Sequence, residues 1–171
     1  MEAGMVASSS LTSRRGLGGL AALAGGFLVI LSVFAPWMYY PASTSTVTGW
    51  DTFELASGAD KWFTQDAFTT SGFSPGFSGI SVLITGIVLA LIALAMLFSL
   101  SGGAFRLSLG SILVLGLVVL LVFIVGCTNL VSLYATADQN VVRPEWGLFA
   151  LAAGAAVGLV GVWVGMGRGR S

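Results

Sequence analysis

The sequence predicts an all-α membrane protein: a bundle of four transmembrane helices with a small extracytoplasmic cap, made of a short strand and helix, between helices 1 and 2. Three observations predict it. Of the 171 residues, 56% are hydrophobic and only 8% are charged, whereas a soluble domain carries about 25% charged residues. Four long apolar stretches contain no Asp, Glu, Lys, Arg or His. The arginines that flank these stretches gather on one predicted side of the membrane.

Each apolar stretch is long enough to cross a membrane, because about 20 helical residues span the hydrocarbon core. The third is the most apolar, and glycines dilute the first. Residues 34–37, Phe-Ala-Pro-Trp, form a poor signal-peptidase site, so the first span is expected to stay uncleaved. The predicted segments are a disordered cytoplasmic tail (1–15), span one (16–35), the cap (36–78), span two (79–100), a cytoplasmic turn (101–106), span three (107–127), an outer loop (128–145), span four (146–166) and a cytoplasmic tail (167–171).

The distribution of charge predicts the orientation. Short loops rich in Lys and Arg stay in the cytoplasm. One side holds Arg14, Arg15, Arg106, Arg168 and Arg170, with Glu2 as its only acid. The opposite side holds two cations and six acids: Lys61, Arg143, Asp51, Glu54, Asp60, Asp66, Asp138 and Glu145. We therefore expect a multi-pass protein of a bacterial plasma membrane with both termini in the cytoplasm.

Aromatic residues repeat this asymmetry. Trp and Tyr side chains favour the headgroup zone because one end of the ring is apolar and the other is polar. The predicted interfacial anchors are Trp37, Tyr39, Tyr40 and Trp146 on the outer side and Trp163 near the inner side.

The first outer loop is too long and too aromatic for a loose linker. Ten aromatic rings in water would be costly, so they are expected to pack together, onto the bilayer or against a partner. Thr44–Thr48 favours a strand or hairpin arm. Asp51 and Glu54 have the spacing of a capping box, which predicts a helix over Thr52–Ser57 that Gly58 stops. The ten rings are Trp37, Tyr39, Tyr40, Trp50, Phe53, Trp62, Phe63, Phe68, Phe73 and Phe77.

Small residues recur at helical spacing in spans one and four. Such stripes let two backbones approach closely in lipid. We expect the two stripes to face each other inside the bundle; the alternative is that the span-four stripe faces another protein. The stripe residues are Gly18, Ala22 and Gly26 in span one, and Gly147, Ala150, Gly154, Gly158, Gly161 and Gly165 in span four.

The residues that usually carry chemistry are scarce. The chain has no His, and its one cysteine, Cys127, cannot form an internal disulfide. No zinc spacing, phosphate loop, catalytic triad or nucleotide fingerprint is found, and basic residues are too few for nucleic acid. We expect no catalytic residue, no metal site and no cofactor.

Two motifs carry a family resemblance. Phe34-Ala35-Pro36-Trp37, and then Gly49-Trp50-Asp51-Thr52-Phe53-Glu54-Leu55 before span two, resemble small four-helix membrane proteins of actinobacteria, in which an outer Pro-Trp precedes a Gly-Trp loop. The resemblance covers mainly residues 16–100 and implies a topology and a compartment but no reaction. Claudin-like tetraspans share the plan of a long first outer loop with Trp; this chain lacks their paired loop cysteines.

These observations favour a non-catalytic accessory or scaffold subunit. It would act through its outer aromatic cap and its small-residue helix faces, on a membrane or envelope protein or on a second copy of itself, among membrane lipids. The alternative is a binder of lipid or another apolar envelope molecule at the outer leaflet; a third option is an enzyme using outer carboxylates such as Asp51 or Asp66. The candidate contact residues are Trp50, Phe53, Trp62 and Phe63.

Overall fold

The computed structural model describes residues 2–58, 79–100 and 141–166, and positions 116, 117, 120, 121, 123, 124, 127, 128 and 131. The chain is mainly helical, and three short strands form one small sheet. In chain order the elements are α1 (Glu2–Phe34), β1 (Pro36–Tyr40), β2 (Ser45–Thr48), α2 (Gly49–Ala56), α4 (Gly79–Leu100), β3 (Arg143–Pro144) and α6 (Trp146–Met166).

Within the described residues, three helices are long and apolar enough to cross a membrane. Their apolar windows are Arg14–Phe34 in α1, Gly79–Phe98 in α4 and Trp146–Gly165 in α6. Helices α4 and α6 occupy the same residues as the predicted second and fourth spans. Each of the three helices exposes a row of large apolar side chains, as expected of helices that face lipid. Their length and apolar composition are those of the membrane-spanning helices of a membrane protein.

Helix α1 is longer than predicted. Its 33 residues extend over about 50 Å, more than the roughly 30 Å of a hydrocarbon core. The segment predicted to be a disordered tail (1–15) is part of this helix in the structure, where α1 begins at Glu2. No proline interrupts the chain before Pro36, and extending a helix costs much less than nucleating one. Pro36 disfavours the helical conformation at Ala35, so α1 ends at Phe34.

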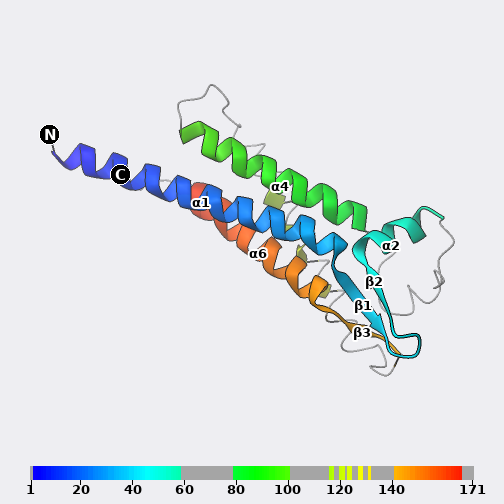
Figure 1. The fold of residues 1–171 in the computed structure, drawn as a ribbon. Helices are drawn as coiled ribbons and strands as arrows, with labels where there is room; N and C mark the ends of the chain where they lie inside the picture. Colours follow the sequence, from blue (N-terminus) through cyan, green and yellow to red (C-terminus); the bar gives the residue numbers. More distant parts are fainter. Residues whose placement is uncertain are drawn as a thin grey trace.

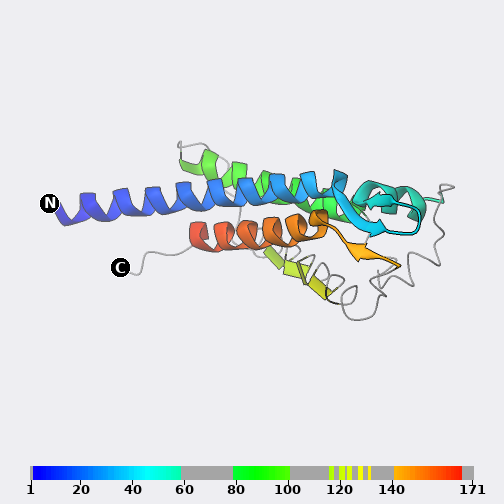
Figure 2. The ribbon, with the colours of Figure 1, turned by 60° about the horizontal axis from the view of Figure 1, so that its bottom comes forward.

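Helix α1 lies between α4 and α6 and makes most of the contacts between helices, as Figures 1 and 2 show. It is antiparallel to both. Gly18 near its start lies against Gly165 near the end of α6, and Gly19 lies against Leu97 near the end of α4. Helices α4 and α6 consequently run in the same direction, from the end that carries the sheet toward the opposite end.

The small residues of α1 and α6 form the contact between these two helices. A methyl group added at Gly18 would lie 2.5 Å from the amide nitrogen of Gly165, and one at Gly25 would collide with the backbone of Gly158. A methyl at Gly161 would collide with the backbone of Ala22, and one at Gly154 would lie 3.0 Å from the carbonyl oxygen of Gly25. Backbone thus touches backbone along the interface, which is where dispersion contacts hold helices together in lipid.

Gly26 does not belong to this contact. A methyl there would lie 2.9 Å from the amide nitrogen of Ala90 in α4, so the residue that faces α6 is Gly25. The stripe therefore runs through Gly18, Ala22 and Gly25, at spacings of four and three residues. Spacings alternate in this way because an α-helix has about 3.6 residues per turn. Gly26 serves a second close contact, between α1 and α4.

The sheet connects the end of α1 with the start of α6. Strands β1 and β2 form an antiparallel hairpin, and β3 pairs with the other edge of β1, giving the order β2-β1-β3. The expected strand over Thr44–Thr48 is confirmed for Ser45–Thr48, which form β2, whereas Thr44 belongs to the turn. Arg143 and Pro144, which lie in the predicted outer loop (128–145), form β3 at the sheet edge, where a proline is tolerated because no ladder hydrogen bond needs its nitrogen. We refer to the sheet and α2 together as the cap.

Several predicted segments lie wholly or largely outside the described residues. They are the second half of the expected cap (59–78), the cytoplasmic turn (101–106), most of span three (107–127), part of the outer loop (132–140) and the last tail (167–171). Every described position between 116 and 131 is helical.

The close contact of α1 and α6 predicts a large effect of bulk at Gly25. Gly25→Leu should destabilise the protein by about 1–3 kcal/mol or more, because a side chain there must push two backbones apart. Ala24→Leu is the matched control, since Ala24 is exposed. The measurement is unfolding of both variants in mild detergent; equal stability of the two would contradict the interface.

Candidate functional site

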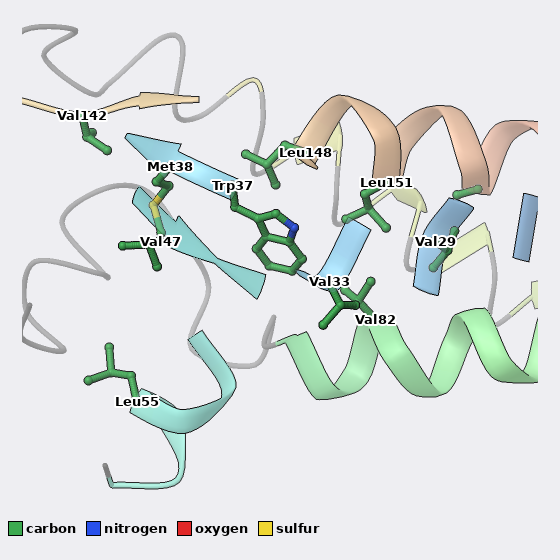
Figure 3. Close-up of a cluster of buried hydrophobic side chains, with 11 residues drawn as sticks. Val29, Val33, Trp37, Met38, Val47, Leu55, Val82, Val142, Leu148 and Leu151 are labelled. Atoms are coloured by element: carbon green, nitrogen blue, oxygen red, sulfur yellow. The ribbon is translucent and has the colours of Figure 1, made fainter. Parts of the chain in front are cut away.

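Trp37 occupies the centre of the buried cluster where the helices meet the cap. It is 0% exposed and lies among Val33 of α1, Val82 of α4 and Leu148 of α6 (Figure 3). Its indole nitrogen donates a hydrogen bond of 2.7 Å to the carbonyl oxygen of Ser32. This bond satisfies the polar group of a ring that is otherwise enclosed by apolar side chains.

A β-bulge places this ring. The pairing of β1 with β2 shifts between Pro36 and Met38, so that Trp37 is the extra residue. A bulge re-aims a side chain, and here the neighbours Trp37 and Met38 are both fully buried. The backbone of Trp37 also joins the sheet to α6, because its carbonyl oxygen accepts a 2.9 Å hydrogen bond from the amide of Glu145.

Two glycines let α2 and α6 pack closely on the Trp37 ring, and a third lets α4 pack on α2. A methyl at Gly49, the first residue of α2, would lie 2.6 Å from the ring, and one at Gly147 in α6 would lie 2.9 Å from its Cδ1 atom. Gly79, the first residue of α4, packs against the carbonyl group of Gly49. Any side chain at these positions would separate the cap from the helices.

Thr52 links α2 to α4 through a buried hydroxyl group. Its Oγ1 donates to the carbonyl oxygen of Gly49 at 2.6 Å and accepts from the amide of Gly79 at 3.1 Å. The first amide of a helix lacks a partner within that helix, so Thr52 provides one for α4. The side chain is fully buried.

Phe34, at the end of α1, and Trp50 and Phe53, in α2, together form an aromatic surface. The rings of Phe34 and Trp50 stack with centroids 6.0 Å apart, and Phe53 packs on Trp50 at 5.2 Å with the planes tilted by 58°. The indole nitrogen of Trp50 donates to Glu54 Oε1 at 2.9 Å. Phe34, the last residue of α1, is 56% exposed, and the other two are partly exposed. The surface therefore begins where a candidate membrane span ends and continues onto the cap.

Asp51 has a structural role in the cap. Its carboxylate accepts hydrogen bonds from the backbone amide and the hydroxyl group of Thr48, at 2.8 and 2.7 Å. The capping box is thus Thr48 with Asp51, and the prediction of Asp51 with Glu54 was displaced by three residues. The stop was placed correctly: α2 ends at Ala56, and Gly58 adopts a positive φ of 85°.

The predicted interfacial anchors divide into two groups. Trp146 and Trp163 are 59% and 76% exposed, so their rings can reach headgroups, and Tyr39 and Tyr40 are half-buried in β1. Trp37 corrects the prediction. Trp37 lies in the core because the bulge turns its side chain inward. Neither its residue type nor its position beside Pro36 distinguishes a buried Trp from an interfacial one.

Two of the four candidate contact residues lie together in the structure. Trp50 and Phe53 come together in the aromatic surface, to which the structure adds Phe34, a residue that the sequence analysis counted as part of span one. Trp62 and Phe63 lie outside the described residues, and Ala150 is half-buried in α6.

Among the described residues, no three His, Cys, Asp or Glu side chains are grouped so that they could hold a metal ion. Comparison with known proteins gives no match to a family model, to a curated protein or to a solved structure. The structure itself indicates the class: a helical chain with three helices suited to a membrane and a small cap of three strands and one helix. Any conclusion about function must come from its residues.

Truncation of Trp37 should unfold the junction of cap and helices. Trp37→Ala is expected to cost about 3–5 kcal/mol, because it leaves a large cavity. Trp37→Phe, which keeps a ring but loses the bond to Ser32, should cost less. Trp163→Ala serves as the exposed control and should change the free energy of unfolding by less than about 0.5 kcal/mol. Similar stability of Trp37→Ala and Trp163→Ala in detergent would refute the assignment.

Thr52 offers a finer test of the link between α2 and α4. Thr52→Val keeps the shape but leaves the amide of Gly79 without its bond, so we expect a loss of about 1–3 kcal/mol. Thr52→Ser retains the hydroxyl group and should lose less. Hydrogen exchange at the Gly79 amide reports the link directly; unchanged protection in Thr52→Val would argue against it.

Proposed function

We propose that this protein is a non-catalytic accessory or scaffold subunit that binds another membrane or envelope protein through the aromatic surface of its cap. The observation that supports this most is the stack of Phe34, Trp50 and Phe53 on a rigid cap. Large aromatic side chains dominate the energies of protein interfaces. A surface held in place by packing also loses little conformational entropy on binding.

The orientation is part of the proposal. We place the cap outside the cell and both termini in the cytoplasm, because Arg14 and Arg15 lie at the end of the helices opposite the cap, whereas Asp51, Glu54 and Glu145 lie in or beside the cap. The membrane in question is a bacterial plasma membrane, in keeping with the resemblance to actinobacterial tetraspans.

A fourth span is also proposed. Helix α4 ends at the end opposite the cap and α6 begins at the cap, so the chain between Leu100 and Trp146 must return across the membrane. Residues 107–127 are the one apolar stretch there that is long enough. The helical state of the described positions in this stretch agrees with that assignment.

The small-residue stripes are less suited to an external partner. Gly18, Gly154 and Gly161 are buried in the contact between α1 and α6, which favours the internal packing of these stripes. The cap is therefore the surface that we propose for the partner, which is either a different protein or a second copy of this chain.

One observation favours the second candidate, a binder of lipid or another apolar envelope molecule. Phe34 is exposed at the end of a candidate membrane span, at the level where an acyl chain or headgroup could reach the rings. The enzymatic alternative has less support, because the Asp51 carboxylate caps α2; Asp66 lies outside the described residues.

Trp50→Ala should reduce recovery of a crosslinked or co-purified protein partner by about tenfold or more in mild detergent, since removing a central aromatic contact typically costs at least 1.4 kcal/mol of binding energy. Trp163→Ala is the matched control at the opposite end of the bundle and should keep full recovery. Both variants are first compared for folding by thermal unfolding.

The outcomes separate the candidates. Loss of a stoichiometric protein in Trp50→Ala alone supports a protein partner. Retention of lipid without any protein partner, and loss of that lipid in Trp50→Ala, supports the second candidate. Full assembly of Trp50→Ala at native levels would contradict the proposed contact surface.

A further inference from the structure

The tip of the β1–β2 hairpin combines exposed hydroxyl groups with a neighbouring proline. The sequence from Pro41 to Thr46 reads Pro-Ala-Ser-Thr-Ser-Thr. Ser43, Thr44 and Thr46 are exposed and Ser45 is partly exposed, and the hairpin extends away from the helices (Figure 1). Chain segments rich in Ser, Thr and Pro are typical acceptors of O-linked sugars.

Within the described residues, the hydroxyl groups of Ser43, Thr44 and Ser45 contact the backbone of the turn. Thr44 Oγ1 donates to the carbonyl oxygen of Ser43 at 2.7 Å, and Ser45 Oγ donates to the same oxygen at 3.1 Å. Ser43 Oγ lies 3.5 Å from the carbonyl oxygen of Tyr40. These contacts hold no other element in place, so a sugar at these atoms would not break a link between the cap and the helices.

Folding does not account for the residue types at the tip. Thr44 has a φ of 51°, a left-handed conformation in which Gly or Asn is favoured and a β-branched residue is strained. The backbone conformation at position 44 therefore does not explain why this residue is threonine and not glycine. Farther along β2, Val47 is fully buried and the hydroxyl group of the half-buried Thr48 donates to Asp51, so the exposed hydroxyl groups of the hairpin lie at its tip.

We propose that Ser43, Thr44 and Thr46 are acceptors for O-glycosylation by a membrane transferase that uses a sugar carried on a polyprenyl phosphate. The hydroxyl oxygen attacks the anomeric carbon of the donor sugar. The bond between oxygen and anomeric carbon forms, the bond from that carbon to the phosphate oxygen breaks, and polyprenyl phosphate leaves with the electron pair. The hydroxyl proton passes to a base of the transferase. The inference relies on the proposed outer location of the cap and is independent of the partner surface, which lies on α1 and α2.

The test is mass spectrometry of the full chain, purified from the membranes of its native host. The peptide that contains residues 41–46 should carry one or more hexose or hexosamine units, located on Ser43, Thr44 or Thr46 by fragmentation that preserves the glycosidic bond. The variant with Ser43→Ala, Thr44→Gly, Ser45→Ala and Thr46→Val should lose this mass entirely while remaining folded, because glycine suits the positive φ at 44 and valine suits a strand at 46.

The serines at the other end of the molecule are the control. Ser8, Ser9 and Ser10 lie in α1 far from the cap and should carry no sugar. An unmodified tip, or phosphate in place of sugar, would overturn the inference but leave the Trp50 partner test unaffected. Sugar on these serines and not on the tip would overturn both the inference and the proposed orientation.

Discussion

The enclosure of the Trp37 indole ring is the contact on which the rest of the structure depends. The ring fits because Gly49 and Gly147 have no side chains, and its nitrogen is satisfied by Ser32. Strand β1, which carries the ring, meets α2 and α6 at this point, and Gly79 brings the start of α4 against α2. The cap is therefore an extension of the helix core and not a separate domain, which explains how so short a segment can be ordered at all.

The same physical constraint, close approach of backbones, organises the helices. In lipid no hydrophobic effect drives helices together, so contact area and dispersion must do so. Helix α1 meets this need twice, with Gly18 and Gly25 toward α6 and Gly26 toward α4. A central helix with two glycine faces gives a bundle whose shape tolerates little change in side-chain volume, and it leaves the large apolar side chains for the lipid.

Rigidity has a consequence for the proposed function. The stack of Phe34, Trp50 and Phe53 is anchored at one end to α1 and at the other to α2, and both helices are held by the Trp37 cluster. A partner that binds this surface meets a preformed shape. The hairpin tip lies at the end of β2 opposite α2 (Figure 1), so a sugar at the tip and a protein at the aromatic surface can be present together.

The sequence by itself determined the features that depend on local composition: the apolar windows of α1, α4 and α6, the strand over Ser45–Thr48 and the end of α2 before Gly58. Only the tertiary structure decided which rings are buried. Trp37 was expected at headgroups, and a β-bulge turns it into the core. Likewise Gly25 and not Gly26 makes the contact with α6, and β3 forms within the segment predicted to be an outer loop. The reason is physical: hydropathy reports whether a residue leaves water, whereas the neighbour that it meets depends on register and bulges set by residues far away in the chain.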